Sequence, residues 1–185
     1  MKKLKRPPYA DRSDLQKIRS QWKKLTGLHA RDEPSAAIVR AATAVELSVN
    51  LAIRAEFAAQ GELSAATVNG MMKRANGLRN KMQNLLTPLV IGRTNQAAVK
   101  GLGKAAEKIN DARNDIVHSG VFSSRSASTT TIEQCRQFIN SMVRLYEEDF
   151  ELGMLVKEVN EAPAPEVKAD TKPKTRLKKV KKPKS

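Results

Sequence analysis

Apolar residues recur at steps of three and four along most of the chain, which is the spacing of one face of an α-helix. The longest row of this kind is Ile38, Ala42, Val45, Val49 and Ala52. It follows Pro34, a residue favoured in the first turn of a helix, and it stops before Gly61. The pattern therefore predicts a long helix from Pro34 toward Gln60 with one face packed against neighbours.

Two further helices are expected on either side of it. Ser13 and Gln16 have capping-box spacing and open a helix that should end near Thr26-Gly27. Ser64 is a candidate N-cap for a helix that should continue until Thr87-Pro88 stops it, followed by a loop over 88–96. The apolar rows are Leu15, Ile18, Trp22 and Leu25 in the first helix, and Val68, Met72, Ala75, Leu78, Met82 and Leu85 in the second.

The second half of the chain predicts two more helices. The most regular row is Ala98, Leu102, Ala105, Ile109, Ala112 and Ile116. This helix should end at His118-Ser119-Gly120, with Gly120 in the left-handed capping conformation. After a Ser/Thr-rich connection over 123–129, Thr130 and Glu133 have capping-box spacing and open the last helix. Its row is Ile132, Cys135, Ile139, Met142 and Tyr146, widened by Phe138, Leu145 and Leu152.

No alternating strand pattern competes with these helices, so the sequence predicts an all-α fold. We expect an up-and-down four-helix bundle over 34–159 with an additional N-terminal helix. The corresponding division is a basic segment at 1–33, a helical bundle at 34–160 and a Lys/Pro-rich tail at 161–185 that should be disordered. With Cys135 alone no intramolecular disulfide can form, and no stretch has the length of a signal peptide or membrane span. A cytoplasmic protein without membrane contacts is expected.

The net charge of +15 is concentrated at the two ends of the chain. Residues 1–31 carry +8 and residues 161–185 carry +6, which leaves +1 for the predicted bundle. The bundle is therefore not a uniformly basic platform for nucleic acid. The tail, with Lys178, Lys179, Lys181 and Lys182, could bind nucleic-acid backbone or could simply confer solubility. We favour weak nucleic-acid binding, without base stacking.

The most distinctive string of the chain is Arg113-Asn114-Asp115-Ile116-Val117-His118, at the end of the fourth predicted helix. Histidine can move a proton near neutral pH, and arginine can hold and neutralise a phosphate. On an ideal helix Asn114 and His118 share an outward face. Arg113 lies about 140° from His118 and flanks the apolar row, so the two should not converge within one helix unless its last turn distorts. A second copy of the helix could instead supply the missing partner, which predicts a symmetric dimer with a composite site.

Two simpler interpretations stay open at the same residues. His118 can be an ordinary residue at a helix C-terminus, where the helix dipole favours a cation. Arg113 and Asp115 can be a solvated pair beside the apolar row. A helix C-terminus also repels phosphate unless nearby cations outweigh it.

The string Ala112 to Gly120, together with the helix that contains Ala-Ala-Thr-Ala-Val-Glu-Leu-Ser-Val-Asn-Leu, resembles the HEPN superfamily of helical nucleotide-binding and ribonuclease domains. That family shows Arg, four to six residues, then His at the end of a late helix. The resemblance covers roughly residues 34–155. It implies a bundle that dimerises through the motif-bearing helices and, in active members, cleavage of RNA without a metal or other cofactor.

The resemblance also implies roles for individual residues. His118 would act as general acid or base, Arg113 would orient the phosphate and stabilise its charge, and Asn114 would fix the histidine or the phosphate by a hydrogen bond. Glu46 matches a position in the first bundle helix that is often acidic in the family. It could pair with Arg113 or be an ordinary surface glutamate.

Other chemistry-bearing residues favour structural interpretations. His29 is expected in a surface loop, and Cys135 in a packed row. The acids Glu147, Glu148, Asp149 and Glu151 point in different directions on a helix, so no metal site is predicted. No phosphate-binding glycine loop is present, because Gly101-Leu-Gly103 falls inside a helix.

Three functions follow from these observations. The first is a homodimeric HEPN-type endoribonuclease that acts on RNA as a toxin or defence component and could be restrained by an antitoxin or other protein partner. The second is a catalytically inactive HEPN-like module for dimerisation and RNA binding, since a fold does not establish a function. The third, ranked lowest, is a basic DNA-associated architectural protein that depends on its tails.

Overall fold

The computed structural model of the protein describes residues 7–61 and 63–155. Within these residues every regular element is a helix, so the predicted all-α class is confirmed. The elements are α1 (Asp14–Ala30), α2 (Pro34–Gln60), α3 (Ala65–Arg74), α4 (Leu78–Lys81), the π-helical turn η1 (Met82–Leu86), α5 (Thr87–Leu89), α6 (Gln96–Ser119) and α7 (Arg125–Arg144). The tail lysines Lys178, Lys179, Lys181 and Lys182 lie outside the described residues.

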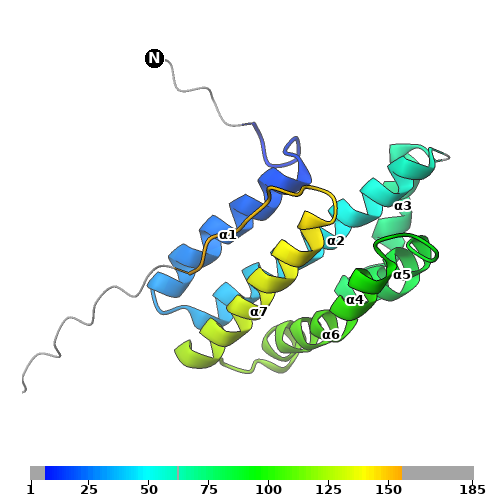
Figure 1. The fold of residues 1–185 in the computed structure, drawn as a ribbon. Coiled ribbons are helices and arrows are strands. Elements are labelled where there is room, and N and C mark those ends of the chain that lie inside the picture. Colours follow the sequence, from blue (N-terminus) through cyan, green and yellow to red (C-terminus); the bar gives the residue numbers. More distant parts are fainter. Residues whose placement is uncertain (1–6, 62, 156–185) are drawn as a thin grey trace, which may run out of the picture.

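The long helix α2 is at the centre of the fold. The helix α1 lies along one of its sides, α7 along another, and α6 with the short helices α3 to α5 covers the rest (Figure 1). The five residues of its predicted row are all buried, and so are Ala41, Ala44 and Ile53 on neighbouring positions. Because α2 is covered on several sides, it buries more of its circumference than one amphipathic stripe would.

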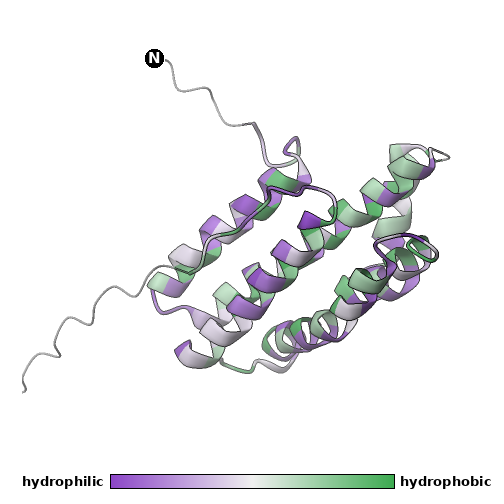
Figure 2. Ribbon diagram, viewed as in Figure 1, coloured by the Kyte–Doolittle hydropathy of each residue, from purple (hydrophilic) through white to green (hydrophobic). Residues whose placement is uncertain are grey.

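Hydropathy along the other long helices explains how they cover α2. On α1, α6 and α7, hydrophilic and hydrophobic positions alternate along the ribbon (Figure 2), as expected for helices with one buried face. The buried residues of α1 are in the same hydrophobic core as those of α2 and α7; the largest are Ile18, Trp22 and Leu25. The segment ahead of residue 34 therefore contributes directly to the core.

By length and apolar composition alone, α2 could cross a membrane; it is the one such helix among the described residues. More than half of its most apolar stretch is buried inside the protein. The central helix of a water-soluble core has the same length and composition, so this property is weak support for a membrane span.

Several predicted helix ends are confirmed. Ser13 and Gln16 form both hydrogen bonds of a capping box, and the Ser64 side chain accepts a hydrogen bond from the Thr67 N–H. Gly120 takes the left-handed conformation after α6, with φ of 65°. The end of α1 was predicted too early, because Gly27 is inside the helix and Asp32, with φ of 59°, makes the turn instead.

The predicted single helix from Ser64 to residue 86 is wrong. The chain leaves the α-helix after Arg74 and re-enters it at Leu78, through Gly77 with φ of 84° and ψ of 159°. That conformation is open to glycine and strained for other residues. Both pieces still bury their apolar positions, including Val68 and Met82, which is why the spacing of apolar residues did not reveal the break.

Pro88 also fails to stop the helix where it was expected to. The turn before it is π-helical over Met82–Leu86, and the Thr87 N–H donates to the Met82 carbonyl five residues back. Pro88 lies in the first turn of α5, where the missing N–H of proline is tolerated. The helix therefore continues to Leu89, and the loop that follows is shorter than predicted.

The last helix, α7, begins earlier than the Thr130 start expected from the sequence. Its N-cap is Ser124, whose side chain accepts a hydrogen bond from the Ala127 N–H. The Ser/Thr-rich stretch that was predicted as a connection is the first part of the helix. There the hydroxyls of Thr129, Thr130 and Thr131 each donate to the carbonyl four residues back, so they do not compete with helix formation.

The chain after α7 is a strap, which we define as residues 145–155, rather than the continuation of a helix to residue 159. In Figure 1 it runs back beside α1. Leu152 is held on both sides by Asn140, whose Oδ1 accepts from the Leu152 N–H (2.8 Å) and whose Nδ2 donates to the Leu152 carbonyl (3.4 Å). Phe150 and Leu152 are buried, so the strap closes the core over α7. Residues 156–159 of the predicted bundle lie outside the described part of the chain.

Candidate functional site at the end of α6

The inward face of α6 differs from the row that the sequence suggested. Ala98, the first member of the predicted row, is exposed, whereas Val99 and Ala106 are buried together with Ile109. Val99 and Ala106 are seven residues apart, and the next position in this register is Arg113. Arg113 therefore continues a buried row, and its half-buried side chain starts from the side of α6 that faces the protein.

The Arg113 guanidinium nevertheless meets the other two motif residues. Its Nη1 donates to Asn114 Oδ1 at 3.0 Å and lies 3.3 Å from His118 Nε2. The expectation that Arg113 and His118 would not converge within one helix is thus wrong. The reason is the length of the arginine side chain, whose end group can curve around the helix surface while its Cα stays on the inner side. His118 itself is exposed.

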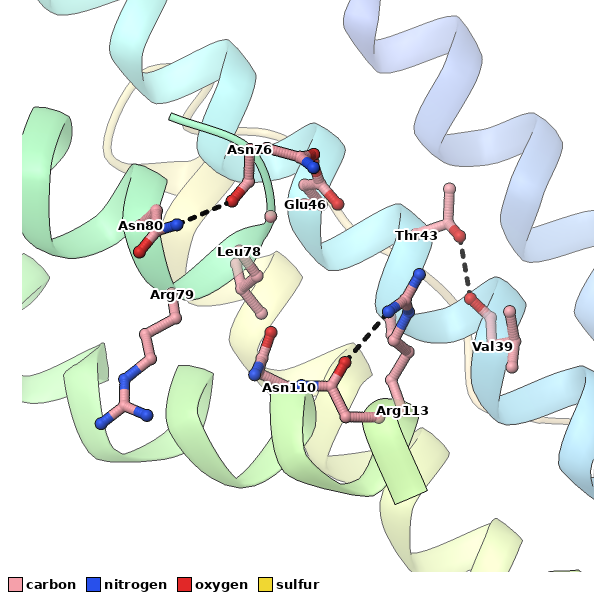
Figure 3. A pocket seen from close by; sticks show the side chains of 12 residues that line it. Val39, Thr43, Glu46, Asn76, Leu78, Arg79, Asn80, Asn110 and Arg113 are labelled. Carbon is pink, nitrogen blue, oxygen red and sulfur yellow. Dashed lines mark hydrogen bonds between the residues drawn. The ribbon is translucent and has the colours of Figure 1, made fainter. Parts of the chain in front are cut away.

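A pocket of about 440 Å³ lies next to this cluster, between α2, the turn from α3 to α4, and α6 (Figure 3). Arg113 and Asn114 line it, so the motif is at its edge. Its lining is mostly polar: Val39, Ala42, Thr43 and Glu46 from α2; Asn76, Gly77, Leu78, Arg79 and Asn80 from the turn; and Asn110, Arg113 and Asn114 from α6. The Arg113 guanidinium and several carboxamides therefore line one hollow, whereas the Arg79 guanidinium extends away from it (Figure 3) toward Glu107, at 3.9 Å.

Glu46 lines this pocket but does not pair with Arg113. Its Oε1 accepts a hydrogen bond from Lys81 Nζ at 2.6 Å. The Lys81 side chain is only 9% exposed, whereas that of Glu46 is 35% exposed. A buried ammonium group needs a compensating charge, and Glu46 supplies it while keeping one side open to the pocket.

The residues that sequence reasoning missed come mainly from the break between α3 and α4. Asn76, Arg79 and Asn80 were assigned to a continuous helix, and the turn places them on the pocket wall instead. The dipeptide Asn76-Gly77 was the available signal, because Asn-Gly is a frequent turn sequence. Lys81 was missed as well, since nothing in the spacing of apolar residues marks a lysine for burial.

The outer face of α6 carries charge of both signs. Residues eighteen apart return to the same face after five turns, so Lys100 and His118 point in the same direction. Along this face lie, in order, the exposed residues Lys100, Lys104, Lys108, Asp111, Asp115 and His118. Exposed apolar side chains lie on both sides of His118 in the sequence, at Val117, Val121 and Phe122, and Phe122 is 92% exposed.

The remaining candidates from the sequence have structural surroundings. His29 is the last-turn histidine of α1 rather than a loop residue; its Nε2 lies 3.0 Å from Thr129 Oγ1. Partial burial, together with nearby Arg125, lowers the pKa of its imidazole. Burial raises the pKa of the Cys135 thiol to about 12, as fits a packing residue. Within residues 7–61 and 63–155 no three His, Cys, Asp or Glu side chains gather in a metal-binding arrangement.

Comparisons with known protein families, with curated proteins and with solved structures gave no match for this chain.

Proposed function

We propose that the chain is a cytoplasmic, homodimeric endoribonuclease of HEPN type, with a four-helix bundle of α2, the α3-to-α5 segment, α6 and α7, supplemented by α1. The observation that carries the proposal is the joint contact of Arg113 with His118 and Asn114 at the edge of a polar pocket. An exposed imidazole can transfer a proton, and a guanidinium beside it can stabilise charge on a phosphate, which are two of the functions that metal-free cleavage of a phosphodiester uses.

The proposed reaction is an internal transesterification of RNA. The ribose 2′-oxygen gives up its proton to a base and bonds to the adjacent phosphorus, while the bond from phosphorus to the 5′-oxygen breaks and that oxygen takes a proton from an acid. The products end in a 2′,3′-cyclic phosphate and a 5′-hydroxyl. His118 serves as the acid or the base, and Arg113 neutralises charge that builds on the phosphate oxygens.

Two proton-transfer groups are needed, and each chain offers one histidine in the motif. This supports a composite site in which a second copy supplies the other His118. Such a site requires the C-terminal ends of the two α6 helices to meet, and the exposed apolar side chains Val117, Val121 and Phe122 lie at that end. The Ser123 N–H donates to Ser35 Oγ at 2.9 Å, so the neighbouring Phe122 is presented from an anchored segment. An exposed aromatic on an anchored backbone suits an interface.

The test of catalysis is cleavage of RNA by the wild-type protein and by His118→Ala in the presence of EDTA. We expect the variant to lose cleavage by at least about 10²-fold with an unchanged thermal unfolding midpoint. His29→Ala is the matched control, since His29 is the other histidine of the chain and lies outside the pocket. Equal cleavage by wild type and His118→Ala would refute the proposal.

A second function is favoured by one observation, the exposed apolar group Val117, Val121 and Phe122 beside the motif. It is a module that dimerises and binds RNA without cutting it. Sedimentation of wild type and Phe122→Asp tests the interface, and a monomeric Phe122→Asp is expected under both functions. RNA binding without any cleavage in a dimeric wild type would favour the silent module over the ribonuclease.

A further inference from the structure

The pocket beside Arg113 has a composition unlike that of a general phosphate-binding surface. A surface that binds nucleic-acid backbone is dominated by cations and neutral donors, because every phosphate presents the same negative charge. This pocket also contains a carboxylate, which repels a phosphate, and several carboxamides, which offer both donors and acceptors. Groups of this kind recognise the edges of bases, where donors and acceptors alternate.

The two ends of the pocket differ in chemistry. Arg113 extends toward Val39 and Thr43, whereas Glu46 lies on the side of Asn76 (Figure 3). Thr43 and Glu46 are separated by three residues of α2, a rise of about 4.5 Å. The cationic end and the carboxylate end are thus close enough for a single nucleotide to contact both. The pocket volume of about 440 Å³ is in the range of small-molecule sites.

Glu46 determines which base the pocket would accept. Lys81 binds its Oε1, and the side chain remains partly exposed, so Oε2 can accept a hydrogen bond from a ligand. A carboxylate accepts from the exocyclic amino group of cytosine or adenine and repels the carbonyl oxygens that uracil presents at the same position. Lys81 holds Glu46 in place through its hydrogen bond to Oε1.

Asn110 supplies the second set of contacts. Its carboxamide extends from α6 toward Leu78 on the opposite wall (Figure 3). A carboxamide presents one donor and one acceptor in a plane, which matches two adjacent positions on a base edge. The Asn80 Nδ2 is already used, since it donates to the Asn76 carbonyl at 3.0 Å and stabilises the turn.

We propose that this pocket binds the base of the nucleotide next to the cleaved phosphate and selects a base with an exocyclic amino group over uracil. Glu46 and Asn110 are the residues that specify the base, and Arg113 contacts the phosphate. The inference rests on the proposed ribonuclease function for its biological setting, but the pocket can be tested without any cleavage.

The experiment is a titration of the full-length protein with nucleoside 3′- and 5′-monophosphates of adenine, cytosine and uracil, followed by calorimetry or by NMR shifts. We expect the adenine and cytosine nucleotides to bind about tenfold more tightly than the uracil nucleotides. Glu46→Gln should reduce that preference, because an amide can donate to a carbonyl oxygen. Asn110→Ala should weaken binding of every nucleotide, and Asn110→Leu, which keeps the bulk of the side chain but removes its donor and acceptor, should weaken it as well.

Gln134→Leu is the matched control, an exposed carboxamide on α7 that does not line the pocket, and it should bind like the wild type. Equal binding of uracil and adenine nucleotides, or wild-type binding by a folded Asn110→Leu, would overturn the proposal. If the base preference is present and RNA is never cleaved, the ribonuclease function fails and the pocket stands. If RNA is cleaved and the Asn110 variants change neither nucleotide binding nor cleavage, the base-binding role of the pocket is refuted while the ribonuclease function stands.

Discussion

Arg113 and His118 meet at 3.3 Å between Nη1 and Nε2, although their side chains leave α6 about 140° apart. The contact exists because Arg113 starts from the buried row of Val99 and Ala106 and bends outward, while His118 is on the solvent side. The base of the Arg113 side chain is therefore anchored by packing, whereas the His118 imidazole is free to approach a ligand. This division of roles leads to the first prediction.

Replacing Arg113 by lysine should be as harmful as replacing it by alanine. Because Nη1 alone contacts both Asn114 and His118, the rest of the planar guanidinium is left to hold a phosphate through two parallel N–H donors, a geometry that the compact ammonium group of lysine lacks. We expect both variants to lower RNA cleavage by about 10²-fold or more, in the range seen when one group that stabilises developing charge is removed. Arg74→Lys, at an exposed arginine that does not line the pocket, is the control. Full activity in Arg113→Lys would show that charge alone is sufficient.

The effects of substituting Glu46 and Lys81 on the free energy of unfolding should be strongly non-additive. Glu46→Ala leaves the Lys81 ammonium buried without its partner, and we expect a loss of about 2 kcal/mol in the free energy of unfolding, since Glu46 is partly exposed. The double variant Glu46→Ala/Lys81→Met removes the buried charge as well and should recover at least about half of that loss. Urea denaturation of the two single variants and the double variant measures the coupling. Simple additivity of the two single effects would contradict this account.

A side chain at position 77 should destabilise the protein through backbone strain rather than through a steric clash. With φ of 84° and ψ of 159° it occupies a region that alanine rarely adopts, and nothing lies within 4 Å of a Cβ built there. Gly77→Ala should therefore lower stability by about 1–3 kcal/mol and distort the pocket wall. Gly70→Ala is the matched control inside α3, equally open in space, and it should raise stability by about 0.5–1 kcal/mol. Thermal unfolding of the pair separates backbone strain from crowding.

Tyr146 should make stability depend on alkaline pH. Burial, reinforced by the hydrogen bond from its hydroxyl to the Glu56 carboxylate at 2.8 Å, raises the pKa of its phenol in the folded protein. The unfolded chain has an ordinary tyrosine pKa of about 10, so rising pH above that value ionises and favours the unfolded state. The stability advantage of wild type over Tyr146→Phe should be complete below pH ~10 and should shrink above it. Denaturation of both proteins from pH 8 to 11 tests this, and a constant difference would contradict it.

Much of the fold could be predicted from the sequence because α1 and α2 follow simple rules. The Ser13 capping box and the row of α2 are local signals that packing reinforces. The break at Gly77 could not be predicted from the spacing of apolar residues, because those on both sides of it are buried with helical spacing. The start of α7 was predicted too late, because a Ser/Thr-rich stretch is typical of a loop. Here the threonine hydroxyls donate to helix carbonyls, and the stretch is helical.

The candidate site was predictable in its residue types but not in its geometry. The motif identified Arg113, Asn114 and His118, and the helical wheel placed His118 on the exposed face, whereas Asn114, expected on the same outward face, is half-buried and lines the pocket. A helical wheel gives only the direction in which each side chain leaves the helix, so it could not show how far the long Arg113 side chain extends around α6. It also could not reveal the pocket, which depends on a turn between α3 and α4 and on Lys81 turning Glu46 away from Arg113.

The strap has a consequence for how the protein folds. Trp22 Nε1 donates to the Gly153 carbonyl at 3.2 Å, joining positions 131 residues apart, and so connects α1 to the last part of the described chain. A contact over such a separation can form only after the intervening chain is largely ordered, because the entropy of closing the loop comes first. The strap should therefore dock late, onto an α1 that already packs along α2. Residues ahead of α2 are then part of one cooperative unit with residues 34–155, rather than an appendage that can open by itself.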